Sequence, residues 1–285
     1  MAGGSNQGIL HLSTCCALAK KPSEDRGTSN LSNVRRALDF KRFKYRQGEG
    51  WAMSEVKLLG ICGSARPRGN SRYLLEQALE GALSVGSVEA ETYSIARKEY
   101  APCDSCRRCA TLGHCRIEDD FQELRDKWVA ADAIIYSVPV YHMSVPGQLR
   151  CFIDRLGNSL RTGRGQILKV IGSIAQGSDI FSGQEQTLTY LNNHAMLMGC
   201  IPVRGDRWES YIGAAGWTQN STRKDAIKRL YESGHLDAQA VVKACCSLGR
   251  HVAQVALLVK SGGQIQRRIL EADGGYDLFL ERIDS

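Results

Sequence analysis

The sequence predicts an α/β fold built on a doubly wound parallel sheet of five strands. Three observations support this. Short apolar runs recur between residues 56 and 205, helical patterns separate them, and polar loops rich in small residues follow the runs. Strands that alternate with helices are typical of parallel sheets, because each crossover between parallel strands needs a long connection. A cysteine-rich loop and a C-terminal helical extension are added to this sheet.

The five predicted strands differ in character. Residues 56–62 form a short apolar run, and residues 132–138 are apolar enough for the centre of a parallel sheet. Residues 88–93 alternate between apolar and polar side chains, which favours a position near an edge. The fourth strand is predicted at residues 166–174 and a short fifth at 199–203.

Helical patterns fill the gaps between these strands. The helix after the first strand places Leu74, Ala78 and Ala82 on one face. The next helix begins after Asp120, with Glu123 at the spacing of a capping box. The later helices are predicted at 148–156, from about 186 to 198, and at 238–260.

The sequence divides into three parts. Residues 1–52 show no sustained period, and we interpret them as a disordered or non-native extension, with Met53 as the natural start; a basic targeting arm is the alternative. Residues 53–205 are the predicted core domain, with the cysteine cluster at 103–115. Residues 206–285 are the helical extension.

The distribution of charge and the hydropathy restrict the kinds of partner that we expect. The net charge is +7, but residues 1–52 carry nine basic and four acidic side chains, so only +2 falls on the remainder. A near-neutral domain is a poor nucleic-acid surface, and we expect no nucleic-acid partner. No apolar run approaches the roughly 20 residues of a membrane span, and no secretory signal is visible. We therefore expect a cytoplasmic protein without a membrane partner.

The loop at residues 63–71 has the composition of a phosphate site. It joins a strand to a helix, and Ser64, Asn70 and Ser71 offer neutral donors while Arg66 and Arg68 add charge. A helix N-terminus and backbone amides favour an anion in this layout. Neither a dinucleotide fingerprint nor a Walker loop is present, so an ordinary polar turn is the alternative.

Two further loops follow predicted strands, at residues 139–147 and 175–185. Ligands of doubly wound sheets bind outside the carboxyl ends of the strands, so the three loops should meet at one edge. Tyr141 and Met143 could cover an aromatic ring system there. Together the loops predict a phosphate site beside a flat, partly apolar slot.

Four of the eleven cysteines lie within thirteen residues. They are Cys103, Cys106, Cys109 and Cys115. Zinc sites more often use two separated pairs, whereas this compact run resembles ferredoxin spacing. Arg107, Arg108 and His114 lie between them and could offset an anionic cluster. A [4Fe–4S] cluster is favoured; zinc, and a thiol or disulfide switch, stay open.

These motifs resemble the flavodoxin-like NADPH-dependent FMN reductase family. The resemblance rests on residues 63–71, 131–141 and 153–155 and covers about 56–205, and the cysteine motif is similar to that of iron–sulfur flavoproteins. It implies a flavodoxin-like fold, bound FMN, a [4Fe–4S] cluster, and electron exchange with ferredoxin or another small electron carrier. NAD(P)H is a candidate co-substrate, and a homodimer or homotetramer is expected.

The resemblance also implies the site residues. Those for the FMN phosphate follow the first strand: Ser64, Arg66, Gly69, Asn70 and Ser71. Those along the isoalloxazine follow the third and fourth strands: Pro139, Val140, Tyr141, Met143, Ser144, Gln176 and Gly177. The implied cluster ligands are Cys103, Cys106, Cys109 and Cys115. No catalytic side chain is predicted, since the flavin carries the chemistry.

The sequence thus predicts an FMN-dependent electron-transfer oxidoreductase with a [4Fe–4S] cluster. One alternative is an NAD(P)H-dependent FMN or quinone reductase without a cluster. A second is a non-catalytic sensor that uses zinc or thiols. Because the cysteine loop follows the second strand, we expect it on the carboxyl side of the sheet, close to the flavin loops.

Overall fold

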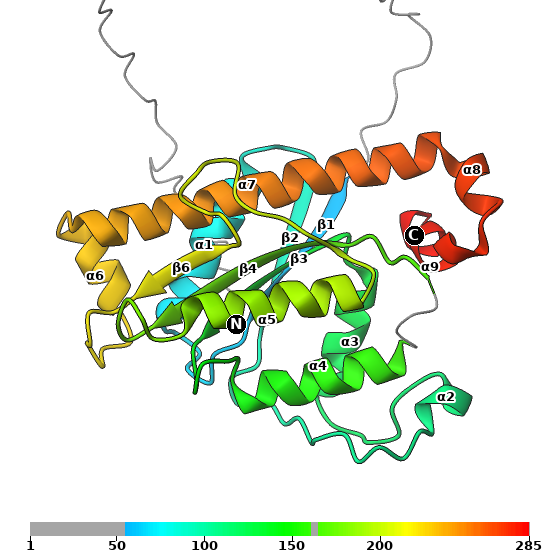
Figure 1. The fold of residues 1–285 in the computed structure, drawn as a ribbon, viewed down its shortest axis with the longest axis horizontal. Helices are drawn as coiled ribbons and strands as arrows, with labels where there is room; N and C mark the ends of the chain where they lie inside the picture. The colour runs from blue at the N-terminus through cyan, green and yellow to red at the C-terminus, as the bar shows by residue number, and fades with distance from the viewer. Residues whose placement is uncertain (1–54, 161–164, 285) are drawn as a thin grey trace, which may run out of the picture. The chain divides into compact units, whose positions relative to one another are not determined.

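The computed structural model describes residues 55–160 and 165–284. The predictions for residues 1–52 lie outside these ranges. Within them the chain forms a parallel sheet with strand order β2-β1-β3-β4-β5 (Figure 1). The order is that of flavodoxin-like doubly wound sheets, so the predicted fold class is confirmed. The five strands are β1 (Val56–Cys62), β2 (Val88–Ser94), β3 (Ala133–Pro139), β4 (Val170–Gly177) and β5 (Ile201–Pro202).

A sixth strand, β6 (Ala214–Trp217), was not predicted. It pairs with the second half of β4, from Ile174 to Gly177, whereas β5 pairs with the first two residues of β4. Two short strands therefore share one edge of β4. The sequence of β6 is Ala-Ala-Gly-Trp, which lacks the β-branched residues that mark most strands. The C-terminal segment is consequently not only helical.

Helices cover both faces of the sheet (Figure 1). The long ones are α1 (Asn70–Leu83), α3 (Phe121–Ala130), α4 (Gly147–Ser159), α5 (Gln184–Leu197) and α7 (Leu236–Ile265). The short ones are α2 (Cys109–Leu112), α6 (Ala226–Glu232), α8 (Arg267–Glu271) and α9 (Asp277–Ile283). Buried side chains of α1 and α7 make one core with the sheet, and those of α3, α4 and α5 make the other.

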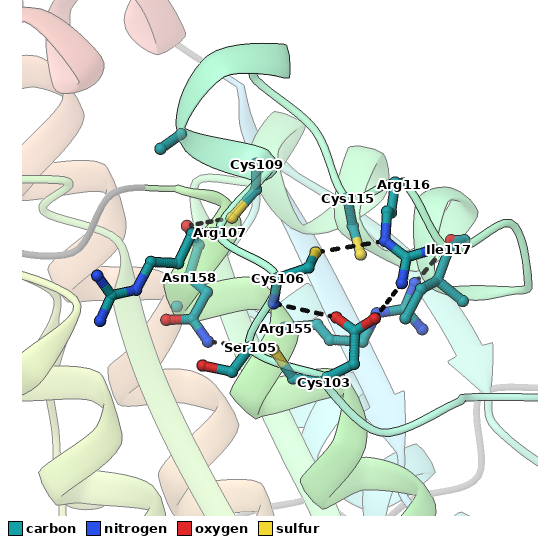
Figure 2. A pocket seen from close by; sticks show the side chains of 13 residues that line it. Cys103, Ser105, Cys106, Arg107, Cys109, Cys115, Arg116, Ile117, Arg155 and Asn158 are labelled. Atoms are coloured by element: carbon teal, nitrogen blue, oxygen red, sulfur yellow. Dashed lines mark hydrogen bonds and ion pairs between the residues drawn. The ribbon is translucent and has the colours of Figure 1, made fainter.

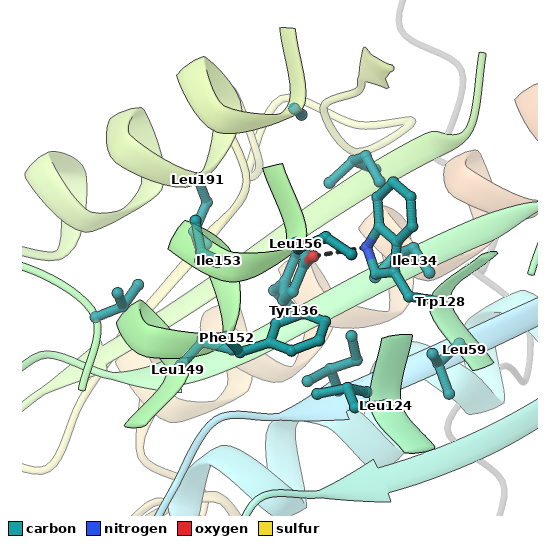
Figure 3. Packing of buried hydrophobic residues seen from close by; sticks show 14 of the residues in the cluster. Leu59, Leu124, Trp128, Ile134, Tyr136, Leu149, Phe152, Ile153, Leu156 and Leu191 are labelled. Carbon is teal, nitrogen blue, oxygen red and sulfur yellow. Dashed lines mark hydrogen bonds between the residues drawn. The ribbon is translucent and has the colours of Figure 1, made fainter. Parts of the chain in front are cut away.

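The core beneath α3, α4 and α5 is rich in aromatic residues (Figure 3). Trp128 and Tyr136 are both buried, and the indole Nε1 donates to the Tyr136 hydroxyl at 2.8 Å. Phe152 packs against Phe121 with ring centroids 5.6 Å apart. The polar atoms of the large rings are thus satisfied inside an otherwise apolar layer.

On the other face, α1 and α7 approach so closely that their backbones touch. A Cβ built on Gly249 would lie 1.7 Å from the carbonyl oxygen of Ala78, and one on Gly81 would lie 2.2 Å from that of Cys246. Only glycine fits at these two positions. Because α1 begins directly after the loop at residues 63–69, this close contact positions the helix onto which that loop leads.

Helix α7 also answers the question of a membrane span. Among the described residues it is the one helix long and apolar enough to cross a membrane by length and composition. Its most apolar window, with a mean hydropathy of 1.2, is 61% buried against the rest of the chain. Val241, Leu248 and Val252 all belong to the core with α1. It is a core helix.

The predicted start of α3 is confirmed, but the predicted capping box is wrong. The Asp120 side chain makes no cap hydrogen bond to α3. It accepts instead from the Glu99 amide at 2.7 Å and pairs with Lys98 at 3.0 Å. The Phe121 amide donates to Asp119 at 3.0 Å, so the neighbouring carboxylate does the capping.

Candidate functional site

The loops after β1, β3 and β4 meet at the carboxyl edge of the sheet, and Gln176 joins them. The Gln176 carbonyl accepts from the Val140 amide at 2.8 Å, and its side-chain amide donates to the Ser71 hydroxyl at 3.5 Å. The Ser137 hydroxyl donates to the Ser71 carbonyl at 2.7 Å. The convergence expected from the strand order is therefore present, and one backbone contact and two side-chain contacts hold it.

The loop at residues 63–69 has features of an anion site. Ser64 is buried, and its hydroxyl accepts from the Arg66 amide at 3.1 Å. Gly69 is the residue before α1 and makes no side-chain cap, so the first amides of the helix keep no side-chain partner there. Unsatisfied amides at a helix start favour a phosphate. The loop thus fits the phosphate of FMN.

Asn70 has a second task that the sequence did not reveal. Its side-chain amide donates to the Arg223 carbonyl at 3.2 Å, and its side-chain oxygen accepts from the Ile227 amide at 3.0 Å. Asn70 therefore fastens the segment before α6 to the phosphate loop. These partners lie more than 150 residues away in sequence, which no local pattern could show.

A tight turn shapes the loop after β3. Tyr141 and Ser144 exchange backbone hydrogen bonds at 2.9 and 3.0 Å, and the two residues between them have positive φ. These are His142 at 47° and Met143 at 66°. Side-chain-bearing residues seldom adopt such angles, and strain of this kind concentrates at ligand-binding sites.

Exposed apolar side chains line the same edge. Tyr141 is 47% exposed, Met143 54% and Phe181 92%. Gly183 packs so closely on Met143 that an added Cβ would lie 2.7 Å from the sulfur. The loops after β3 and β4 are thus in direct contact, and together they present an apolar rim. Pro139 and Gly177 are buried behind it. The arrangement fits a planar ring laid on this edge.

The four clustered cysteines line a single cavity of about 570 Å³ (Figure 2). Asn158 touches two of them: its side-chain amide donates to the Cys103 sulfur at 3.5 Å, and its carbonyl accepts from the Cys109 thiol at 3.3 Å. Arg116 donates to the Cys106 sulfur at 3.4 Å. Asn158 and Arg116 therefore contact three of the four thiols at the wall of this cavity.

Arg155 closes the cysteine loop at its base. Its side chain is fully buried and donates to the carbonyls of Ala101 and Ile117 at 3.3 and 2.8 Å, one on each side of the cysteines. It also pairs with Asp119 at 2.5 Å and contacts Cys115. One guanidinium on α4 thus holds both ends of the loop and one of its thiols.

The charges at this base are mutually stabilised. Burial raises the pKa of the Asp119 carboxyl, but the Arg155 hydrogen bond and two backbone amides outweigh it and lower the pKa below its usual range. Burial lowers the pKa of Arg155, while the bonds to Asp119 and Cys115 raise it overall. Asp119 and Arg155 therefore stay ionised together.

We expected the cysteine loop close to the flavin loops, but it lies at the other end of α4 from the turn at residues 141–144. The cavity borders Arg155, Gly157 and Asn158, at the last turns of α4, whereas the turn at residues 141–144 precedes the first turn. A helix rises about 1.5 Å per residue, so Gly147 and Asn158 lie roughly 16 Å apart. The chain that follows β2 reaches the C-terminal end of α4, where Arg155 and Asn158 bind Ala101 and Cys103.

The donor set fits a thiolate-bound cluster, but the side chains are not in a ligating arrangement. In the ranges 55–160 and 165–284, no three His, Cys, Asp or Glu side chains come together as a metal-binding group. The thiols use Asn158 and Arg116 as partners instead. Arg155 and Asn158 were missed as site residues, although Arg155 stands in the 153–155 motif and Asn158 follows it by one helical turn.

A model of the NADPH-dependent FMN reductase family matches residues 56–210. An iron–sulfur flavoprotein of Methanocaldococcus jannaschii is 33% identical over 207 residues, covering 72% of this chain and 100% of the relative. One of Methanosarcina thermophila is 34% identical over 172 residues, covering 60% and 87%. The structure of RosB with bound 8-demethyl-8-formylriboflavin-5′-phosphate superposes with a TM-score of 0.52 at 14% identity, covering 75% and 87%, and supports the fold.

Proposed function

The chain belongs to the NADPH-dependent FMN reductase family and is a flavin-dependent oxidoreductase, and we propose that it exchanges electrons between FMN and a [4Fe–4S] cluster. The observation that carries the proposal is the gathering of four thiols around one cavity, with the Arg116 and Arg155 guanidiniums at its wall. The relatives named as iron–sulfur flavoproteins support it. The cluster ligands would be Cys103, Cys106, Cys109 and Cys115.

The chain's own residues would hold FMN at the carboxyl edge of the sheet. Ser64, Arg66 and the first amides of α1 would bind its phosphate. The turn at 141–144 and the backbone of Gln176 and Gly177 would line its ring. FMN, once bound, supplies one- and two-electron redox chemistry, so no side chain has to act as nucleophile or base.

The cysteine loop would present its thiols from a base that α4 holds rigid. A [4Fe–4S] cluster, once bound, supplies one-electron transfer and carries negative charge with its four thiolates. The guanidiniums of Arg116 and Arg155 would offset that charge, and the Asn158 amide would donate to a ligand sulfur. These side chains would thereby favour the thiolate forms of the ligands.

The proposed partner is ferredoxin or another small electron carrier, because a one-electron centre on an exposed loop needs a one-electron acceptor. Cys103 and Cys106 are both exposed, which suits contact with such a carrier. A homodimer or homotetramer would cover the apolar rim of Tyr141, Met143 and Phe181. The cytoplasmic location stays a prediction.

The alternative is an NAD(P)H-dependent FMN or quinone reductase without a cluster. One observation favours it: the thiols make hydrogen bonds to Asn158 and Arg116 rather than converging on one point. In that case the exposed rim would receive the nicotinamide or a quinone. A zinc- or thiol-based sensor would need neither the strained turn at 141–144 nor the rim.

The visible spectrum of anaerobically purified protein separates these functions. Flavin bands with a broad shoulder that bleaches on reduction, and about four irons per chain, are expected for the cluster. Flavin bands with iron near zero would contradict the cluster and support the reductase without a cluster. A protein without any flavin would contradict both.

Cys109→Ser tests the ligand assignment. We expect iron to be lost while FMN is retained, because the cysteine loop and the flavin edge lie at opposite ends of α4. Cys151→Ser is the matched control, since Cys151 lies on α4 outside the cavity lining. Iron content in Cys109→Ser equal to that of the parent protein would remove Cys109 from the ligand set.

A further inference from the structure

A cavity of about 390 Å³ lies at the amino edge of the sheet, opposite to the loops that would hold FMN. Its wall combines the end of α3, the residue after α4, the stretch that leads into β4, and α9. Apolar side chains make up most of the lining, among them Trp128, Leu160, Ile167 and Leu278. Trp128 is the buried indole that Figure 3 shows beside Tyr136. The cavity is large enough for a small organic molecule.

Two cations belong to the same wall, and both are buried. Lys169 is 1% exposed and Arg282 is 8% exposed. Arg282 pairs with the buried carboxylate of Asp132 at 3.3 Å, and Lys260 pairs with that same carboxylate at 2.8 Å. In the described part of the chain, Lys169 makes no ion pair. A buried charge without an opposite charge is costly, so the protein alone leaves Lys169 without a counter-charge.

The ammonium group of Lys169 also has a hydrogen-bond donor to spare. It donates to the Val129 carbonyl at 2.7 Å and to the Ala131 carbonyl. An ammonium group carries three N–H donors, and among the residues that the structure describes only these two carbonyls accept from it. The nitrogen lies 5.1 Å from the ring centroid of Trp128, which borders the cavity. The third donor therefore lacks an oxygen or nitrogen acceptor beside the cavity.

The surroundings of Lys169 disfavour its charged form. Burial lowers the pKa of Lys169 well below its usual range, and the nearby charge of Arg282 lowers it further. The charges of Cys200 and Asp132 act in the opposite direction but do not outweigh these effects. An anion beside the nitrogen would favour the ammonium form, so its binding would be coupled to the uptake of a proton.

Two carboxylates also border the cavity, and neither neutralises Lys169. Asp126 is largely exposed and pairs with Arg125 at 2.9 Å. Glu281 is exposed on α9. Water screens exposed charges much more than buried ones, so the positive charge dominates inside the cavity.

We propose that this cavity binds a small organic carboxylate with an apolar body, such as an arylalkanoate. Its carboxylate would accept a hydrogen bond from Lys169 and be attracted by Arg282, and its body would lie against Trp128 and Leu278. A mostly apolar lining with a few convergent polar groups is the usual composition of a small-molecule site. The proposal does not depend on FMN or on the cysteine loop, because none of the proposed ligands of either borders the cavity.

The test is isothermal titration calorimetry of the full-length protein with 3-phenylpropanoate. Two comparison ligands share its body: 3-phenylpropanamide is neutral, and 3-phenylpropylamine is cationic. Lys169→Met removes the ammonium group and keeps an apolar side chain of similar length. Leu278→Asp places a carboxylate at the mouth of the cavity, where Leu278 is 39% exposed. Lys127→Met is the matched control, because Lys127 of α3 pairs with Glu91 at 2.5 Å outside the lining.

We expect the parent protein and Lys127→Met to bind 3-phenylpropanoate with a dissociation constant of about 1 mM or tighter. Lys169→Met should bind it about tenfold or more weakly, because the carboxylate would lose its counter-charge. Leu278→Asp should weaken binding roughly three- to tenfold through the repulsion of like charges. Heats measured near neutral pH in HEPES and in Tris, two buffers of different ionisation enthalpy, should show uptake of about one proton per ligand in the parent and none in Lys169→Met.

Three results would overturn the proposal. Binding of the amide as tight as that of the carboxylate would show that the charge contributes nothing. Tightest binding of the amine would show that Asp126 and Glu281 select a cation. Unchanged affinity in Lys169→Met and Leu278→Asp would place the ligand elsewhere. If Lys169→Met does not fold, Leu278→Asp and the proton uptake of the parent still decide. Flavin and iron content do not enter these readouts, so failure here is distinct from failure of the proposed function.

Discussion

The flavin edge and the cysteine loop lie at opposite ends of α4 and are built in different ways. The flavin edge comprises residues 63–71, 139–144 and 176–183, and buried strands carry each of its loops. The cysteine loop comprises residues 101–119, and its cysteines are exposed or half-buried. Its connection to the fold runs through side chains of α4 and α3.

The contrast teaches where single substitutions should act. Hydrogen bonds between backbone groups, as between Val140 and Gln176, survive most side-chain changes. A loop held by Arg155, Asn158 and Gln122 depends on a few side chains. We therefore expect that single substitutions can disturb the cysteine loop and leave the flavin edge intact. Substitutions that disturb the flavin edge alone should be harder to find.

Removing Arg155 should give the largest effect. In Arg155→Met the Asp119 carboxylate stays buried without its guanidinium, and breaking a buried ion pair in this way costs about 3–5 kcal/mol. The free energy of unfolding from urea melts should fall by that amount. Hydrogen exchange should rise mainly within residues 101–119.

The double variant Arg155→Met with Asp119→Asn is the control for the charge. It removes the unpaired carboxylate yet keeps an acceptor for the Ala101 and Phe121 amides. We expect it to recover part of the lost stability. A double variant no more stable than Arg155→Met would show that the unpaired charge is not the cause.

Gly249→Ala disturbs the packing of α1, the helix that follows the phosphate loop, against α7 on the other face of the sheet. The new Cβ would lie 1.7 Å from the Ala78 carbonyl oxygen, so α1 and α7 must move apart. Overpacking of this kind costs about 1–3 kcal/mol. FMN affinity should fall with stability, because α1 carries the phosphate loop, while the cysteine loop should keep its exchange pattern.

Gly262→Ala is the matched control on the same helix. No atom lies within 4 Å of its added Cβ, so we expect a gain of about 0.5–1 kcal/mol from the better helix propensity of alanine. Thermal melts of the two variants should therefore shift in opposite directions. A shift in the same direction would argue against the close contact of α1 and α7.

A buried histidine near the end of α5 adds a pH dependence to the stability of the chain. His194 of α5 is 8% exposed, and in the described chain its Nε2 has no hydrogen-bond partner. Burial, with Arg150 nearby, lowers its pKa to about 4. The unfolded chain binds the proton more tightly, so stability is full above the unfolded pKa of about 6.5 and is lost as pH falls towards 4.

Between pH 7 and pH 5 this histidine should remove about 1–2 kcal/mol of stability. The measurement is the free energy of unfolding at both pH values for the parent and for His194→Gln. Glutamine does not titrate, so the difference between the two pH values should shrink in the variant. An identical difference in both proteins would place the pH dependence elsewhere.

The sequence predicted the flavin edge better than the cysteine loop, for a physical reason. The edge follows from strand order and from local composition, both of which are written in consecutive residues. The path of the cysteine loop depends on Arg155 and Asn158, which meet it across 36 to 55 residues. The fold class and the five long helices α1, α3, α4, α5 and α7 were therefore predictable, whereas this packing was not.

The strand β6 and the role of Asn70 show the same limit. Ala-Ala-Gly-Trp carries no strand signal of its own and becomes a strand because β4 offers an unpaired edge. Asn70 looked like a phosphate donor because it stands in the loop, yet its amide binds residues 223 and 227. In both places a distant partner decides what the local pattern leaves open.

Asn158→Ala is the mildest change and the sharpest test of separability. It removes one donor to the Cys103 sulfur and leaves the backbone carbonyl that accepts from Cys109. Stability should change by less than about 1 kcal/mol, because the side chain is exposed to solvent. Partners of metal-ligating groups typically affect metal affinity about tenfold or more, so iron retention against a chelator should fall by that order.

Gln148→Ala is the matched control, since Gln148 is a half-buried polar residue on the first turn of the same helix, beside the flavin edge. It should leave iron retention unchanged. If Asn158→Ala also leaves iron unchanged while lowering FMN content, the two ends of α4 are not independent. If it lowers iron alone, one side chain tunes the cysteine loop without disturbing the edge that the core builds.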